Sequence, residues 1–75
     1  AEQIVDELVL KNAINQFLRA QKRTERNIFV GRYWHLYSIA ELAQAYGMRE
    51  SKVASLLFRM RKKLKHHLEK EGISV

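Results

Sequence analysis

The chain contains no proline, and its only glycines are Gly31, Gly47 and Gly72. Proline ends or kinks a helix, and glycine inside a helix costs roughly 1 kcal/mol relative to alanine. Good helix formers, chiefly Leu, Ala, Lys, Arg, Glu and Gln, dominate the 75 residues. The sequence therefore predicts an all-α fold, with residues 1–75 forming one small domain of four helices.

The first two helices are predicted from the spacing of apolar residues. This spacing predicts a first helix over residues 3–20. Thr24 is a suitable N-cap for a second helix, which contains Gly31 and runs to His35. The apolar residues assigned to these helices are Ile4, Leu8, Ile14, Phe17 and Leu18 in the first, and Ile28, Phe29 and Tyr33 in the second.

The clearest start signal is the run Ser38-Ile39-Ala40-Glu41, a capping box that predicts a third helix over residues 39–46. Gly47 fits the left-handed residue that ends such a helix. After a turn of three residues, a fourth helix is expected over residues 50–71, stopped by Gly72. Two helices joined by a short turn containing glycine are typical of a helix-turn-helix, here at residues 38–60.

The fourth helix is predicted to have one apolar and one polar face. The polar face carries Phe58, which we expect to lie at the edge of the core. Tyr33 and Trp34, in the second helix, are expected to pack in the core and at its edge. The apolar stripe consists of Val53, Leu56, Leu57, Met60, Leu64 and Leu68, and the opposite face of Ala54, Ser55, Phe58, Arg59, Lys62, Lys65 and His66.

The net charge of +6 is concentrated in two stretches. Residues 21–35 carry +3 and residues 49–75 carry +5, whereas residues 1–20 and residues 36–48 carry −1 each. Residues 59–65 hold five basic residues in seven positions. Such a stretch predicts contact with a polyanion, so the charge favours DNA binding over a plain helical hairpin. A membrane-surface helix is disfavoured, because the core should occupy the apolar stripe.

The sequence offers little for catalysis or metal binding. It has no cysteine, no glycine-rich phosphate loop and no nucleophile motif. His66 and His67 are adjacent and point about 100° apart on a helix, so with His35 they make a poor metal site and are expected to be solvated. We expect no enzyme activity, cofactor or metal. Without a bilayer-spanning run or a signal sequence, we expect a cytoplasmic chain with no membrane partner.

Several short motifs follow one another in a fixed order along the chain. They are Glu25-Arg26-Asn27-Ile28-Phe29, Arg32-Tyr33-Trp34, Ser38-Ile39-Ala40-Glu41-Leu42-Ala43, Tyr46-Gly47-Met48, then Val53, Leu57, Arg59 and Arg61-Lys62-Lys63-Leu64. Together, over about residues 10–73, they resemble the C-terminal promoter-reading domain (region four) of sigma-70 family RNA polymerase sigma factors. The similarity is greatest to the short alternative and extracytoplasmic types.

This resemblance implies a four-helix unit whose last helix enters the major groove of double-stranded DNA at the minus-35 promoter element. It implies RNA polymerase core as a second partner, with another surface of the domain docked on the flap of the β subunit. An anti-sigma protein is a third partner that the resemblance allows. By position, the base-facing residues would be Glu50, Ser51, Ala54 and Ser55, and the phosphate-facing residues Arg49, Lys52, Arg59 and Lys62.

Two positions depart from the family pattern. Family members often have Ser or Thr where Arg49 stands, and many have Lys or Arg where Ala54 stands. Neither departure affects the fold, but both weaken the reading helix. We therefore expect the isolated domain to bind DNA modestly, with polymerase supplying the remaining affinity.

Two other functions remain open at this point. One is a stand-alone helix-turn-helix regulator, which would dimerise and bind a palindrome. The other is a sigma-like interaction module that does not read DNA. A chain of 75 residues has no room for a promoter-melting domain. We therefore expect a fragment or excised domain of a sigma factor, monomeric on its own, or a sigma-like protein that acts alone.

Overall fold

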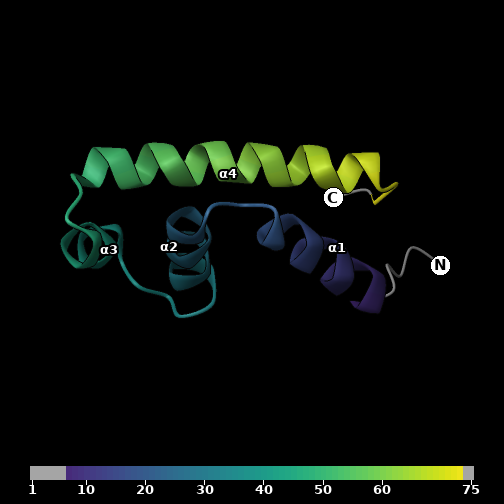
Figure 1. The fold of residues 1–75 in the computed structure, drawn as a ribbon, viewed down its shortest axis with the longest axis horizontal. Coiled ribbons are helices and arrows are strands. Elements are labelled where there is room, and N and C mark those ends of the chain that lie inside the picture. Colours follow the sequence, from purple (N-terminus) through teal and green to yellow (C-terminus); the bar gives the residue numbers. More distant parts are fainter. Residues whose placement is uncertain (1–6, 74–75) are drawn as a thin grey trace.

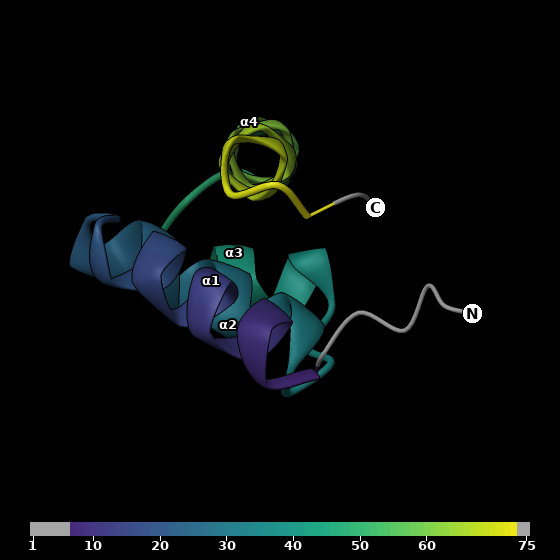
Figure 2. The same ribbon diagram turned by 90° about the vertical axis from the view of Figure 1, so that its right-hand side faces the viewer.

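The structure, a computed structural model, describes residues 7–73 and is all-α over that range, as predicted. Its helices are α1 (Glu7–Arg19), α2 (Arg23–Tyr33), α3 (Ile39–Tyr46) and α4 (Glu50–Lys70). The long α4 lies along one side of an elongated molecule, and the three shorter helices line up beside it (Figure 1). Viewed along α4, the shorter helices form a separate layer (Figure 2). In the described part of the chain, no helix is long and apolar enough to cross a membrane.

The helix-turn-helix forms as the sequence predicts. Ser38 Oγ accepts a 3.0 Å hydrogen bond from the backbone N–H of Glu41, and the Glu41 carboxylate accepts one of 2.8 Å from the N–H of Ser38. Gly47 ends α3 with φ +63° and ψ +37°. The N–H of Met48 then donates to the carbonyl of Ala43 at 2.9 Å, and the N–H of Gly47 to that of Gln44 at 3.4 Å. These paired bonds satisfy carbonyls at the end of α3 and fix the direction in which α4 begins.

The core lies between α4 and the three shorter helices. The predicted stripe of α4 faces it, with five residues buried and Leu64 half-buried. The residues predicted for the opposite face of α4 are all exposed. The main buried cluster consists of Phe17, Leu18, Ile28, Phe29, Leu42, Ala43, Val53, Leu56, Leu57 and Met60.

A smaller buried cluster joins the two ends of the described chain. Ala13 on α1 packs there with Leu68 on α4 and Ile73 beyond it. Gly72 adopts φ +80°, and the N–H of Ile73 donates to the Leu68 carbonyl at 2.8 Å. The predicted stop at Gly72 is therefore confirmed, with α4 ending at Lys70, one residue earlier than expected.

Gly31 on α2 faces side chains of α3 and of the loop before it. A Cβ atom at this position would lie 3.0 Å from Cδ2 of Leu42 and 3.3 Å from Cδ2 of Tyr37. The residue is buried inside α2, where glycine costs helix stability. The close approach of α3 accounts for glycine at this position.

Two expectations for the first helices were wrong. Thr24 is not an N-cap, because α2 already begins at Arg23 and is preceded by Lys22, whose side chain makes no capping hydrogen bond. Leu8 is 62% exposed, since the buried face of α1 is formed by Leu10, Ala13, Ile14, Phe17 and Leu18, about half a turn away. The expected start at residue 3, and Ile4, lie outside the described residues.

Candidate nucleic-acid interface

The residues expected to face DNA bases all lie in the first two turns of α4 and are exposed. At about 100° per residue, Ser51, Ala54 and Ser55 fall within an arc of about 100°. Glu50 is exposed in the first turn but projects about 100° away from Ser51, toward one edge of this face. The helix therefore presents two hydroxyls and a methyl group together, with one carboxylate beside them.

The residues expected to face phosphates are also exposed. Lys52 and Arg59 stand seven residues apart on one side of α4, and Lys62 lies near the middle of the exposed face. Arg49 precedes the helix as its N-cap, with φ −75° and ψ 149°, and makes no side-chain capping bond. Three of the four expected phosphate contacts thus lie along α4, and the fourth stands at its N-terminal end.

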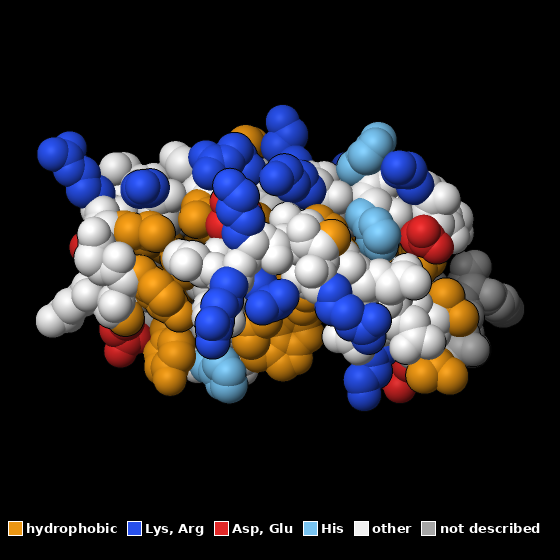
Figure 3. All heavy atoms as spheres, viewed as in Figure 1, with side chains coloured by type: hydrophobic (Ala, Val, Ile, Leu, Met, Phe, Trp, Pro, Cys, Tyr) orange, Lys and Arg blue, Asp and Glu red, His pale blue; other side chains and the backbone are white. Residues whose placement is uncertain are grey.

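The charge on α4 is of one sign over most of its length. From Ser51 to Leu68 the helix contains six Lys and Arg and no Asp or Glu. In the space-filling view, Lys and Arg side chains gather over the middle of α4 (Figure 3). A helix with this charge attracts a polyanion, and a width of about 12 Å lets the major groove of DNA admit an α-helix.

Phe58 was expected at the edge of the core, and this expectation was wrong. Its side chain is 54% exposed on the same face as Ser51 and Ala54. Nζ of Lys62 lies 5.3 Å from the centre of the Phe58 ring, and Cζ of Arg61 lies 5.9 Å from it. The sequence predicted that Phe58 lies on the polar face of α4, but it did not predict how far the side chain is exposed.

Trp34 was expected in the core or at its edge, but it is 57% exposed. It lines a groove of about 840 Å³ between α1 and α2, and a smaller one of about 280 Å³ that reaches α4 at Arg61 and Leu64. We call the larger one the Trp34 groove. Its apolar lining is made by Leu10, Ile14, Leu18, Val30 and Trp34.

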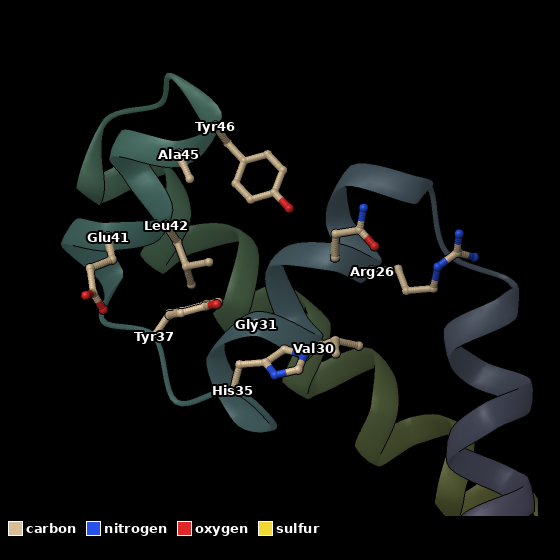
Figure 4. A pocket seen from close by; sticks show the side chains of 10 residues that line it. Arg26, Val30, Gly31, His35, Tyr37, Glu41, Leu42, Ala45 and Tyr46 are labelled. Carbon is tan, nitrogen blue, oxygen red and sulfur yellow. The ribbon is translucent and has the colours of Figure 1, made fainter.

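A further pocket, of about 720 Å³, lies between α2 and α3. Tyr37 and Leu42 face Gly31 at its floor, and Tyr46 closes one side (Figure 4). The loop before α3 also contains Leu36, which is not among the residues that line this pocket. Leu36 is 80% exposed and has φ +59°, a left-handed conformation that leucine rarely adopts.

The histidines behave unequally. His35 and His66 are exposed, as expected, but His67 is half-buried with its ring centre 5.9 Å from that of Phe17. Nε2 of His67 is buried without a hydrogen-bond partner among the described residues. Over residues 7–73, no group of three or more His, Cys, Asp or Glu side chains could hold a metal ion.

Comparison with known proteins gives one similarity. The protein-family model described as "Sigma-70, region 4" matches residues 12–64, which is well over half of the chain. The match includes all of α2 and α3, the turn between α3 and α4, and α4 as far as Leu64. No curated protein and no solved structure matches the chain significantly.

Proposed function

The chain belongs to the family of sigma-70 region 4 domains, and we propose that it reads the minus-35 element of a promoter as part of a sigma factor. In sigma factors this domain reads that element, and the family is a non-enzymatic, DNA-binding one that works with RNA polymerase. The observation that supports the proposal is the exposed face of α4, where the residues expected to face bases lie beside basic side chains.

The basic residues would seat α4 on the duplex. Lys52 and Arg59 would contact phosphates on one side, and Arg49 would contact a phosphate at the start of the helix. Such contacts supply affinity without sequence information, and each makes binding more sensitive to salt. They fix the position and register from which the remaining side chains reach the bases.

The base-facing residues would then read the major groove. The Glu50 carboxylate can accept a hydrogen bond from the amino group of cytosine, and the hydroxyls of Ser51 and Ser55 can bond to several base edges. The methyl group of Ala54 can contact the methyl group of thymine. None of these is a bidentate arginine–guanine contact, so this set gives modest discrimination.

RNA polymerase would supply the remaining affinity through a second surface. We assign that surface to the Trp34 groove, which is lined by residues of α1, by Val30 of α2 and by the two residues that follow α2, and by none of α4. An exposed tryptophan beside a groove with a mostly apolar lining is the kind of anchor that carries binding energy in protein interfaces. The proposed occupant is the flap of the β subunit, for which an anti-sigma protein would compete.

Selection of duplexes from a random pool by the purified chain, at two salt concentrations, tests this proposal. Enrichment of one short asymmetric motif is the expected result. A palindrome would instead indicate a dimeric stand-alone regulator. Binding without enrichment, lost as salt rises, would contradict base reading by this chain and favour an interaction module.

A pair of variants sharpens the selection. Glu50→Ala should change the enriched sequence at one position, because the carboxylate is expected to select cytosine. Glu69→Ala removes an equally exposed carboxylate from the far end of α4 and should leave the motif unchanged. An identical motif from both variants would remove Glu50 from the reading face.

A further inference from the structure

We propose that Phe58 is a specificity-determining residue, whose ring packs against the methyl group of a thymine in the major groove. This inference rests on the proposed function, because it requires that α4 enter the groove by its exposed face. It adds a contact that the base-facing set of Glu50, Ser51, Ala54 and Ser55 does not contain.

The exposure of Phe58 is the first observation behind this proposal. Phe58 is 54% exposed on a face of α4 that otherwise carries small or polar side chains. The stripe of α4 that packs on the core lies on the other side of the helix, so the ring adds nothing to the main buried cluster. A large apolar side chain placed in this way gains by being covered when the helix binds its target.

The position of Phe58 along the helix is the second observation. Phe58 falls about midway between Ser51 and Ala54 around the helix axis. It therefore lies in the middle of the arc formed by Ser51, Ala54 and Ser55, which we call the reading arc. It stands seven residues, or about 10 Å, beyond Ser51. DNA rises by about 3.4 Å per base pair, so Phe58 would meet a base about three pairs away from the one that Ser51 meets.

The charged neighbours of Phe58 select the kind of partner. Lys62 and Arg61 lie 5.3 Å and 5.9 Å from the ring centre, and α4 has no acidic residue between Ser51 and Leu68. A ring bordered by cations suits a surface that places phosphates beside a methyl group. The major groove offers both, since each thymine projects its C5-methyl there between two phosphate backbones.

The chemistry of phenylalanine limits which group on a base Phe58 can recognise. Its side chain neither donates nor accepts a conventional hydrogen bond, so it cannot recognise the polar edge of a base. Apolar contact with the thymine methyl is the direct readout available to it. The proposal therefore predicts discrimination between thymine and uracil, which differ only by this methyl group.

Single uracil substitutions in an enriched duplex provide the test. Each thymine is replaced in turn by uracil, and the affinity of the purified chain is measured by fluorescence anisotropy. At one position, about three base pairs from the site of Ser51, the unmodified chain should lose about fourfold in affinity, the worth of one buried methyl group. Phe58→Ala should bind the parent duplex about fourfold more weakly and show no loss with uracil at that position.

Two further variants control the measurement. Phe58→Leu keeps an apolar side chain and should retain part of the thymine preference, while its helix propensity guards against loss of the fold. Tyr37→Ala removes an exposed aromatic side chain from the pocket between α2 and α3 and should leave every uracil effect unchanged. Circular dichroism establishes that each variant is folded.

The outcomes separate this inference from the proposed function. Equal uracil effects in the unmodified chain and in Phe58→Ala, at every thymine, would overturn the role of Phe58 while leaving promoter reading intact. Failure of the chain to enrich any duplex would overturn the proposed function, and the role of Phe58 with it.

Discussion

Nη1 of Arg61 donates a 2.6 Å hydrogen bond to the hydroxyl oxygen of Tyr33, joining the middle of α4 to the last turn of α2. The Tyr33 ring is itself held 4.8 Å, centre to centre, from that of buried Phe29. Arg61 thus lies between the smaller groove beside Trp34 and the ring of Phe58. Because its guanidinium already donates to Tyr33, Arg61 is not counted among the expected phosphate contacts.

Tyr33→Phe tests this link between α2 and α4. Removal of the hydroxyl should lower the free energy of unfolding by roughly 0.5–1 kcal/mol, as both partners are exposed. Urea denaturation measures the loss. Tyr46→Phe, which removes the hydroxyl of another exposed tyrosine, is the control and should be neutral. An equal loss in both variants would mean that the Arg61 bond adds no stability.

Arg49→Ser should have opposite effects on stability and on DNA binding. A serine N-cap satisfies an N–H at the start of α4 and should raise the stability by about 1 kcal/mol. Loss of the cation should weaken binding to all duplexes and reduce the salt slope by about one. Lys22→Ser, at the uncapped start of α2, should give the first effect without the second. An unchanged salt slope in Arg49→Ser would remove Arg49 from the phosphate-facing set.

Gly47→Ala should destabilise the helix-turn-helix through the backbone alone. A Cβ at this position would meet no atom within 4 Å, but φ is +63°. The left-handed conformation costs alanine about 1–2 kcal/mol, measurable by thermal unfolding. Gly72→Ala, at φ +80° and equally free of contacts, should cost a similar amount and leave DNA binding unchanged. Full stability in both variants would contradict the two left-handed helix ends.

Leu36→Asn should stabilise the domain. Leu36 is left-handed and 80% exposed, so little packing is lost when the side chain changes. Asparagine tolerates this conformation, and a gain of roughly 0.5–1 kcal/mol in the free energy of unfolding is expected. Leu36→Ala shortens the side chain without relieving the backbone, and should show no such gain. A lower stability in Leu36→Asn would mean that the leucine side chain supports the loop.

Arg59→Ala should weaken binding without changing the sequence preference. Arg59 is exposed beside the reading arc, where it would contact a phosphate. Its loss should reduce affinity for all duplexes alike and lower the salt slope by about one, as measured by titrations at several salt concentrations. Lys70→Ala removes an exposed cation at the end of α4 and serves as the control. A changed sequence preference in Arg59→Ala would place Arg59 among the base-reading residues.

The helix-turn-helix could be predicted from local signals because its ends are determined locally. The capping box at Ser38 and the glycine at position 47 each fix a helix end through neighbouring backbone groups, and the structure has both. The apolar stripe of α4 is likewise a property of one helix, repeated over several turns. These features explain why α3 has the expected bounds and α4 differs by one residue.

Features that depend on how helices meet could not be predicted in this way. Thr24 is a favourable capping residue, yet α2 begins before it, at Arg23, where the N–H of Arg26 donates to the Lys22 carbonyl at 2.9 Å. The exposure of Trp34 and the half-burial of His67 depend on where α1 crosses α2 and α4. Leu8 is different, since the spacing from Leu10 to Leu18 already pointed to the correct face of α1. The exposure of Phe58 could not be predicted either, because a residue on the polar face of α4 can lie on the open surface or at the edge of the core.

Whether the exposed face of α4 meets DNA is tested directly by nuclear magnetic resonance of the 15N-labelled chain titrated with the enriched duplex. If α4 enters the major groove, the largest amide shift changes will fall between Arg49 and Lys62, including Ser51, Ala54 and Phe58. Signals from the Trp34 groove should stay in place. Large changes at Leu10, Val30 and Trp34, with the first turns of α4 unaffected, would show that DNA binds at the Trp34 groove and not on the exposed face of α4.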